Sequence, residues 1–217
     1  MMEYMSRIIV PILNGTGVTL QLFFITILLS IPLGLILALA KISKFKFLRD
    51  MTGIYIWLLR GTPLLLQLFF VYFGLPFIPV IGIRLGRFTA AAIAFILNYA
   101  AYFAEIFRAG IQSIDRGQYE GAKALGMTYW QTMRRIVLPQ MVKRVLPPVS
   151  NETITLVKDT ALVYAIGLGE LLRAAKQIVN RDAITSPFIV AAVFYLAMTF
   201  VITQIFKKLE QIYAVYE

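Results

Sequence analysis

The chain has 217 residues, of which 59% are hydrophobic, and its mean hydropathy is +0.78. This apolar share is far above that of an ordinary soluble domain. The lack of cysteine and histidine excludes disulfides, thiol chemistry and most zinc or haem sites. The formal charge of +10 would indicate nucleic-acid binding in a soluble protein, but here the basic residues flank hydrophobic stretches, as the positive-inside rule describes. We therefore expect a single all-α integral membrane domain, residues 1–217, that contacts membrane lipid and no nucleic acid.

The N-terminal part of the sequence predicts one surface helix followed by one membrane span. Residues 1–14 mix an acidic and a basic residue with apolar ones and fit a short amphipathic helix on the outer surface. Residues 16–41 are long and apolar enough to cross a bilayer, and Pro32 is expected to kink this span. Basic residues follow at once, at positions 41, 44, 46 and 49. This end should therefore face the cytoplasm and the N-terminus the outside, and no signal peptide is expected.

The next stretch predicts two further spans joined by an outer loop. Residues 45–59 mix charged and aromatic side chains, which suggests an interfacial helix, and the Gly and Pro of residues 60–63 should break it. Residues 62–77 form the second predicted span, and residues 75–87, with their prolines and glycines, form an outer loop. The third predicted span, residues 88–108, returns the chain to the inner side.

The last two predicted spans differ in character. Residues 139–163 carry charged residues, and Pro147 and Pro148 are expected to interrupt the helix, as in the broken helices that line transporter cavities. Residues 166–181 are polar and should lie outside, and residues 186–207 form a conventional last span with its C-terminal end in the cytoplasm. Under this topology Lys and Arg are twice as frequent inside as outside, which supports the orientation.

The organising segment of the sequence is residues 115–138, a charged stretch between two hydrophobic ones. Its residues up to Leu125 are mostly strong helix formers, Gly126 should bend the chain, and a second short helix should end at Pro139. Lipid contact does not explain such a segment. We expect a compact pair of surface helices that binds a soluble partner.

At this point the sequence resembles a known family. Six residues lie at the spacing of the EAA loop in the permease subunits of bacterial ABC importers: Glu120, Ala122, Gly126, Ile136, Leu138 and Pro139. Gly121 departs from the pattern, because it stands where the family usually has its first Ala. Residues 60–65 and 98–105 look like the polar amino acid uptake branch of this family. The resemblance covers about residues 15–207.

The resemblance implies an ABC importer type I permease architecture, with five transmembrane helices and a cytoplasmic coupling helix. By resemblance the residues that couple to the ATPase are Glu120, Gly121, Ala122, Leu125 and Gly126. The implied partners are a cytoplasmic ABC ATPase pair, a second permease copy or close relative, and an extracellular or periplasmic substrate-binding protein. No Gly-rich phosphate-binding loop ending in Lys-Ser or Lys-Thr occurs in the sequence. ATP and magnesium should therefore bind to the partner ATPase, and this chain should need no cofactor and catalyse no reaction.

The strongest candidate for the substrate pathway is Glu152. It lies eight residues beyond Arg144, about 12 Å along a helix and hence near the middle of the bilayer. An acid at this depth costs at least about 2.5 kcal/mol, so a functional role is the default hypothesis. Glu152 shares one helix face with Thr155 and Asp159. It could bind a cationic group of the cargo, or it could be a structural acid bonded to a neighbour.

A second set of candidates lies on the third span. Asn98, Tyr102 and Glu105 recur on one helix face, and Asn98 sits about halfway across. Asn98 could bind the cargo or form a hydrogen bond between helices. For Glu105 an ion pair with Arg108 is the favoured interpretation. Gln67 is a weaker pathway candidate of the same kind.

The predicted function is uptake of polar amino acids by alternating access in the bacterial cytoplasmic membrane. The acidic Glu152 favours basic amino acids such as arginine, lysine or histidine, with glutamine as the alternative cargo. Arg60 is interpreted either as a gate residue at the inner mouth or as an interfacial arginine whose head reaches water. A secondary transporter is a less favoured alternative. An intramembrane hydrolase is disfavoured, because no water-activating neighbour of the carboxylates is visible.

Overall fold

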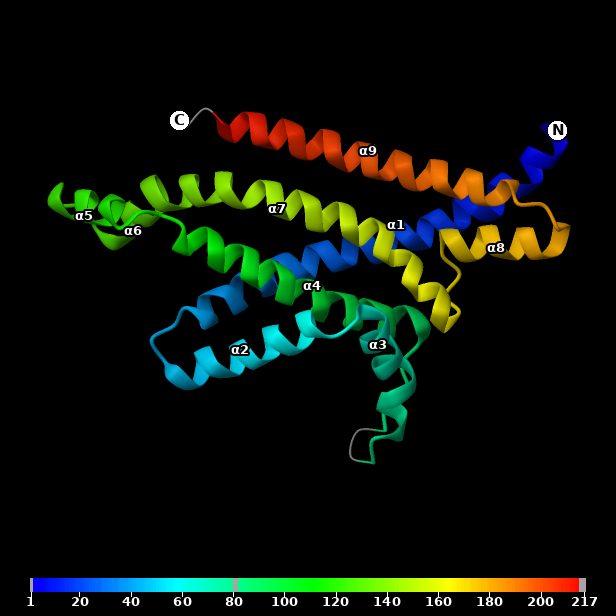
Figure 1. The fold of residues 1–217 in the computed structure, drawn as a ribbon, viewed down its shortest axis with the longest axis horizontal. Coiled ribbons are helices and arrows are strands. Elements are labelled where there is room, and N and C mark those ends of the chain that lie inside the picture. Colours follow the sequence, from blue (N-terminus) through cyan, green and yellow to red (C-terminus); the bar gives the residue numbers. More distant parts are fainter. Residues whose placement is uncertain (1, 80–81, 215–217) are drawn as a thin grey trace.

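The computed structural model describes residues 2–79 and 82–214, and within them the chain is helical with no β-strand. The main helices are α1 (Met2–Lys41), α2 (Lys46–Gly61), α3 (Leu64–Phe69), α4 (Arg87–Gln112), α5 (Arg116–Ala124), α6 (Tyr129–Thr132), α7 (Leu138–Asp159), α8 (Leu171–Asp182) and α9 (Ser186–Ala214). The short elements are the π-helical turns η1 (Phe70–Gly74) and η3 (Met133–Val137) and the 3-10 helices η2 (Leu75–Phe77) and η4 (Thr160–Ile166). The short helices α5 and α6 lie at one end of the molecule, and α8 lies with the N-terminal part of α1 at the other (Figure 1).

The centre of the fold is the contact between α1 and α4, the most extensive between any two helices. A Cβ added at Gly34 of α1 would lie 2.7 Å from the Cβ of Phe103 and 3.1 Å from the carbonyl oxygen of Ala100 in α4. Ser30 and Ala38, one turn on either side of Gly34, are also fully buried. Small residues at every fourth position allow backbones to approach closely, which is how helices commonly pack in membranes.

The expected separate amphipathic helix at residues 1–14 is wrong, because α1 continues without a break from Met2 to Lys41. The physical reason is packing. Ile8 and Ile12 of α1 are completely buried in a cluster with Leu171 of α8, so the N-terminal turns have an apolar face of their own to cover. Pro11, like Pro32, lies inside this continuous helix.

The predicted break at residues 60–63 is present as a sharp bend. Helix α2 and the segment that begins with α3 meet at 104° across a break of a few residues. The segment after the bend is an irregular helix made of α3, η1 and η2. Residues 80 and 81 of the expected outer loop lie outside the described residues.

Two predicted helix breaks around α7 are wrong. Pro139 does not end the second helix of the surface segment, because α6, η3 and α7 follow one another without a loop. The Leu138 N–H donates to the Met133 carbonyl, five residues back, so this widened turn leads into Pro139, which has no N–H to donate. Pro147 and Pro148 lie inside α7, whose packing against α4 and α9 offsets the lost hydrogen bonds.

The helix is interrupted only at the C-terminal end of α7. Helix α7 ends at Asp159, η4 follows, and Gly167 adopts a left-handed conformation with φ of 79° before α8 begins. The expected polar outer segment thus contains a regular amphipathic helix, α8. Its Leu171, Ala175 and Ile178 pack against α1 and α9.

The number of spans is only partly supported by helix length and composition. Within the described residues three segments are long and apolar enough to cross a membrane: Ser6–Lys41, Arg87–Gln112 and Ser186–Tyr213. The bent pair Lys46–Gly61 and Leu64–Phe77 makes up to four. Helix α7 is not one of these segments, and it carries several charged residues among its apolar ones. The fifth crossing therefore stays a prediction.

Candidate functional site

The predicted pathway residues gather around one cavity of about 540 Å³, which we call the central cavity. It lies where the bend between α2 and α3 faces α4 and α7. Its lining consists of Arg60, Gly61, Thr62, Pro63, Leu64, Asn98, Tyr99, Tyr102, Glu152, Thr155, Asp159 and Leu162. Four of the five predicted pathway residues thus line one space, and only Gln67 lies outside it.

Helix α7 contributes the acidic side of the central cavity. Glu152, Thr155 and Asp159 recur along one face of this helix, as their spacing predicts. Asp159 accepts a hydrogen bond of 2.8 Å from the Tyr99 hydroxyl of α4. Within the described part of the chain Glu152 accepts no hydrogen bond, and it is half-buried. The bond to a neighbour that a purely structural acid would need is not found there.

The basic side of the central cavity comes from the last turn of α2. Arg60 is exposed, and its guanidinium carbon lies 5.2 Å from the centre of the Tyr102 ring. A cation over an aromatic face is attracted by the ring quadrupole, so Tyr102 holds this guanidinium at the cavity. Arg60 is therefore exposed but lines the same cavity as Glu152, with its guanidinium over the Tyr102 ring.

Asn98 and Gln67 form a network that fixes the bend. The Asn98 amide nitrogen donates to the carbonyl oxygen of Leu59 and to Gln67 Oε1, both at 3.0 Å. The Gln67 amide nitrogen donates to the Leu59 carbonyl at 2.8 Å and to Thr62 Oγ1 at 2.8 Å. The interhelical hydrogen bond, one of the two interpretations of Asn98, is thus present. Asn98 is only 4% exposed but still reaches the cavity lining.

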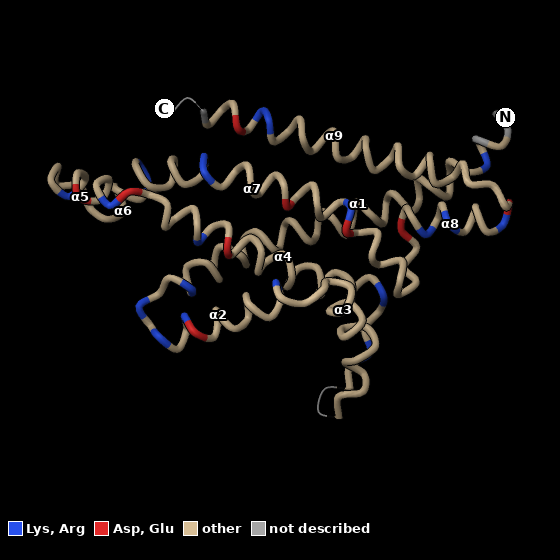
Figure 2. The backbone as a smooth tube through the Cα atoms, in the orientation of Figure 1, with Lys and Arg blue, Asp and Glu red and all other residues tan. Residues whose placement is uncertain are grey.

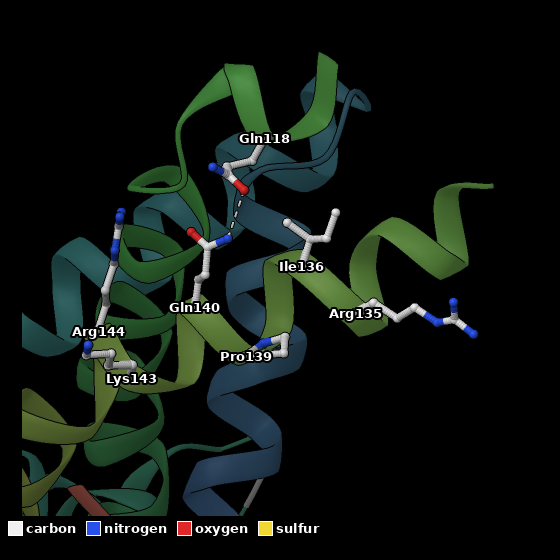
Figure 3. A pocket seen from close by; sticks show the side chains of 7 residues that line it. All are labelled: Gln118, Arg135, Ile136, Pro139, Gln140, Lys143 and Arg144. Carbon is white, nitrogen blue, oxygen red and sulfur yellow. Dashed lines mark hydrogen bonds between the residues drawn. The ribbon is translucent and has the colours of Figure 1, made fainter. Parts of the chain in front are cut away.

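Two further cavities continue from the central one toward α5. The first, of about 410 Å³, shares Arg60, Tyr102 and Glu152 with the central cavity and extends to Ser113 and Arg144. The second, of about 620 Å³, shares Arg144 and reaches the surface helices; Figure 3 shows its lining of Gln118, Arg135, Ile136, Pro139, Gln140, Lys143 and Arg144. Shared lining residues therefore connect the middle of α7 with the end of the molecule that carries α5.

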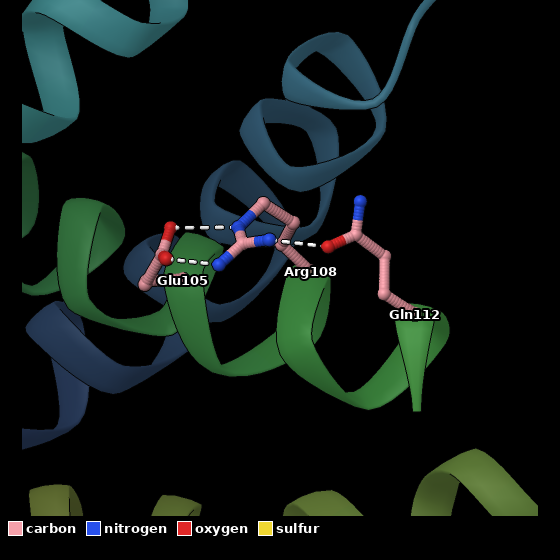
Figure 4. A network of polar contacts seen from close by, with 3 residues as sticks. All are labelled: Glu105, Arg108 and Gln112. Atoms are coloured by element: carbon pink, nitrogen blue, oxygen red, sulfur yellow. Dashed lines mark hydrogen bonds and ion pairs between the residues drawn. The ribbon is translucent and has the colours of Figure 1, made fainter. Parts of the chain in front are cut away.

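Glu105 is held away from the central cavity by a local ion pair. Arg108 Nε donates to Glu105 Oε2 at 3.0 Å, and the same guanidinium also donates to Gln112 (Figure 4). The pair predicted from the spacing of these two residues is present. Glu105 lines only the cavity next to the central one.

The surface segment has well-defined ends and a defined bend. The Asp115 side chain accepts from the Gly117 N–H at 2.6 Å and caps the start of α5. At the other end Gly126 has φ of 70°, and the Met127 N–H donates to the Ala122 carbonyl at 3.0 Å. This is the usual helix stop with a left-handed glycine. Thr128 then opens α6 with a reciprocal capping box. The predicted bend is thus an ordered turn.

The exposure of the residues in this segment differs in one respect from the prediction. Ala122, expected to face a partner, is only 2% exposed and packs against its own chain. Glu120, Gly121 and Gly126 are exposed, and Leu125 is 81% exposed. The sequence reasoning missed Tyr129 and Trp130, which are 67% and 78% exposed on α6. Two adjacent aromatic residues in a polar surface segment are typical of a contact with a partner protein, so the sequence could have indicated them.

Comparisons with known proteins agree with this architecture. A family model described as "Binding-protein-dependent transport system inner membrane component" matches residues 30–213. The arginine transport system permease protein ArtQ of Bacillus subtilis is 42% identical over 92% of this chain and 91% of its own length. A putative glutamine transport system permease protein of Rickettsia felis is 38% identical over 97% of this chain and 98% of its own length.

Solved structures show the same fold. A crystal structure described as an amino acid ABC transporter with histidines superposes with a TM-score of 0.87, at 37% identity and 96% coverage of both chains. The MetNI methionine ABC transporter in an inward-facing conformation has a TM-score of 0.74 at 20% identity, with 98% of this chain and 99% of that chain covered, and supports the fold alone. The chain belongs to the family of binding-protein-dependent transport system inner membrane components: it is a permease subunit of a bacterial ABC importer of the polar amino acid uptake type, a multi-pass protein of the cytoplasmic membrane and not itself an enzyme.

Proposed function

We propose that the chain crosses the membrane five times, with the N-terminus outside and the C-terminus and the α5–α6 segment in the cytoplasm. The basic residues between α1 and α2 lie toward the same end as α5 and α6 (Figure 2), which fits the positive-inside rule. Helix α7 packs against both α4 and α9, two of the apolar helices, and would be the fifth crossing. Arg144, Glu152 and Asp159 are then shielded from lipid because they line the cavities.

We propose that the cargo is a basic amino acid. The observation that carries this is the charge content of the central cavity, whose lining has two carboxylates, Glu152 and Asp159, and one guanidinium, Arg60. A basic amino acid has the complementary set: two cationic groups and one carboxylate. In this arrangement Glu152 binds a cationic group of the cargo, Thr155 and Tyr102 donate or accept hydrogen bonds, and Arg60 binds the cargo carboxylate.

Glutamine is the second candidate. A relative is named for glutamine, and others are named for arginine and L-cystine. The central cavity also offers the amide of Asn98, whose Oδ1 is engaged in no hydrogen bond within the described residues. A neutral side chain would, however, leave one carboxylate of the cavity without a cationic partner, and an uncompensated buried charge is unfavourable. The geometry therefore favours a basic cargo over glutamine.

The transport mechanism we propose is alternating access driven by a partner ATPase pair. ATP and magnesium bind to that partner, and its closure moves the α5–α6 segment. The motion reaches the cavity directly, because α6, η3 and α7 follow one another without a loop and α7 carries Glu152. A hydrogen bond of 3.1 Å from Gln140 Nε2 to Gln118 Oε1 also ties α5 to α7. A second permease copy completes the pathway, and an extracytoplasmic binding protein delivers the cargo.

Within this mechanism the remaining predicted residues have separate tasks. Gln67 positions the bend that carries Arg60, and Asn98 connects the bend to α4. Glu120, Gly121 and Leu125 present the surface that the ATPase binds, and the buried Ala122 lets α5 pack closely on its own chain. The left-handed Gly126 then sets the angle between the two short helices.

The cargo assignment is tested with Glu152→Gln in the reconstituted transporter. Arginine-stimulated ATP hydrolysis or uptake should lose at least about tenfold in half-saturating concentration, since a charge-assisted contact is worth roughly 1.5–3 kcal/mol. The response to glutamine should change less. Glu210→Gln in the last turns of α9 removes the same charge outside the central cavity and should leave both responses unchanged. An arginine response that is unaltered by Glu152→Gln would remove this residue from the site.

A further inference from the structure

Three basic side chains converge at the end of the molecule opposite α5 and α6. The Lys176 Nζ lies 4.7 Å, and the Arg173 guanidinium carbon 5.9 Å, from the centre of the Tyr164 ring. A Cβ added at Gly167 would lie 3.2 Å from Arg173 Nη1 and 3.5 Å from Arg87 Nε, so both guanidiniums reach the same point. We call Arg87, Arg173 and Lys176 the outer basic cluster. They come from the first turn of α4 and from α8.

The fold balances the outer basic cluster only in part, through the attraction between Arg173 and the buried Glu170. None of its three side chains forms an ion pair in the part of the chain that the structure describes. The nearby acid, Glu170, is 0% exposed and is already occupied. It accepts from the N–H groups of Leu172 at 2.7 Å and Arg173 at 2.6 Å, and from the Tyr195 hydroxyl at 3.1 Å. The three like charges repel one another, and the Tyr164 ring offsets this repulsion for only two of them.

Membrane insertion does not explain the outer basic cluster either. The positive-inside rule disfavours Lys and Arg on the outer side, where the proposed topology places these residues. Figure 2 shows the basic positions of α8 at the opposite end from those of α5 and α6. A clustered charge that neither the fold nor insertion requires indicates an anionic partner.

The outer basic cluster also lies close to the transport pathway. Tyr164, on which two of its cations rest, belongs to η4. Leu162, two residues earlier in the same 3-10 helix, lines the central cavity, as does Asp159 just before it. A partner bound to this cluster would therefore contact the 3-10 helix that contributes Leu162 to the lining of the central cavity. A protein that delivers the cargo has to reach the central cavity, and this position beside the cavity lining favours such a protein over a lipid headgroup as the partner.

We propose that Arg87, Arg173 and Lys176 dock an acidic surface of the extracytoplasmic substrate-binding protein next to η4. The inference rests on the topology and the transport role proposed above. Guanidinium groups bind carboxylates through paired N–H donors, and the Tyr164 ring orders two of the cations before the partner arrives. Charges at such an interface chiefly raise the association rate and make it sensitive to salt.

The test uses the full complex of this chain with its ATPase in lipid nanodiscs and the binding protein that stimulates its ATP hydrolysis. The variant is the double substitution Arg173→Gln and Lys176→Gln, which keeps most of the stems and removes two charges. The matched control is Lys207→Gln with Lys208→Gln, two adjacent charges at the other end of α9. The measured quantity is the binding-protein concentration that gives half-maximal stimulation, at about 50 mM and about 500 mM salt, below and above physiological screening.

At low salt the Arg173/Lys176 variant should need about tenfold more binding protein than wild type, and at high salt the difference should shrink to about twofold. Basal ATP hydrolysis and the control variant should match wild type. Equal half-maximal concentrations for variant and wild type at low salt would overturn the proposal. So would a difference that appears only in nanodiscs with phosphatidylglycerol and vanishes in phosphatidylcholine, because the cluster would then bind lipid headgroups.

The same experiment separates this inference from the proposed function. Stimulation of the wild-type complex by a binding protein and its cargo supports the importer mechanism whatever the variant does. If the wild-type complex responds but the variant has an unchanged salt dependence, only the docking assignment fails. If the wild-type complex hydrolyses ATP with no response to any binding protein, both proposals fail together.

Discussion

Replacing Gly126 by valine perturbs the turn between α5 and α6 without changing the membrane helices. Gly126 has φ of 70°, and an added Cβ would meet no atom within 4 Å, so the cost is backbone strain and not a clash. An L-residue in the left-handed region costs about 1–2 kcal/mol, and β-branched residues are least tolerant of it. A change of this size shifts the equilibrium between the native turn and its alternatives by a factor of about 5–30.

The assay is cargo uptake and ATP hydrolysis by the reconstituted transporter, expressed as cargo moved per ATP hydrolysed. Gly126→Val should lower this ratio about fivefold or more, because the surface presented to the ATPase changes its angle while the ATPase itself is intact. Gly17→Ala is the matched control. Its Cβ also meets no atom within 4 Å, and it lies inside α1, away from the ATPase surface, where alanine is favoured over glycine by roughly 0.5–1 kcal/mol. The same uptake per ATP in both variants would refute the role assigned to this turn.

Three further predictions concern the cavity and its supports. Gln67→Leu removes the acceptor of the Asn98 amide and the donors to the bend, so the thermal midpoint in detergent should fall by an amount equivalent to about 1–3 kcal/mol. Gly110→Ala places a Cβ in a clash with Val145 Cγ1 and should force α4 and α7 apart at this contact, which also lowers the midpoint, by about 1–3 kcal/mol. Burial raises the pKa of the Glu170 carboxyl, despite the two backbone N–H groups and the hydroxyl that it accepts from. The pKa of Glu170 is therefore higher in the folded protein than in the unfolded protein. Glu170 contributes its whole share of stability at pH values below the unfolded pKa, and this share is lost as the pH rises through the folded pKa. Glu170→Gln should remove this pH dependence.

Each of these three predictions would be contradicted by a specific result. Gly17→Ala adds the same methyl group to a helix where no atom lies within 4 Å, so a loss of midpoint equal to that of Gly110→Ala would show that packing at α7 is not the cause. A Gln67→Leu protein with wild-type melting would mean that the bend is fixed by something other than the amide network. If the thermal midpoint of the wild-type protein increased as the pH was raised above the usual pKa range of a glutamate, the direction of the pH dependence assigned to Glu170 would be wrong.

Much of the architecture follows from local sequence. The hydropathy of α1, α4 and α9 marks them as spans, and the Gly-Thr-Pro run after Arg60 marks the sharp bend. The period of α7 places Glu152, Thr155 and Asp159 on one face, and all three line the central cavity. These features depend on residues close in sequence, so the pattern alone predicts them.

Other features depend on tertiary packing and were predicted incorrectly or not at all. Local propensity assigns a helix end to Pro139 and a break to Pro147, yet burial of α7 against α4 and α9 keeps both regions helical. The apolar N-terminal turns join α1 because α8, far along the chain, covers them.

Long-range contacts could not be read from the sequence. The Asn98 bond to Gln67 spans 31 residues, and Arg87 and Arg173, from different helices, both reach Gly167. The buried position of Glu170 likewise depends on Tyr195, 25 residues away. Sequence periodicity says which face a residue is on, but it does not say which other helix that face contacts.

The central claim is that the α5–α6 segment faces the cytoplasm and contacts the chain that hydrolyses ATP. Because the sequence has no cysteine, single substitutions give unique attachment points for a thiol cross-linker. Leu125→Cys, at a position 81% exposed on this segment, should cross-link to the ATPase and should be protected from an impermeant thiol reagent added outside intact cells. Gln177→Cys, on the exposed face of α8, should behave in the opposite way. Labelling of Leu125→Cys from outside, or its failure to cross-link to any nucleotide-hydrolysing chain, would contradict the account.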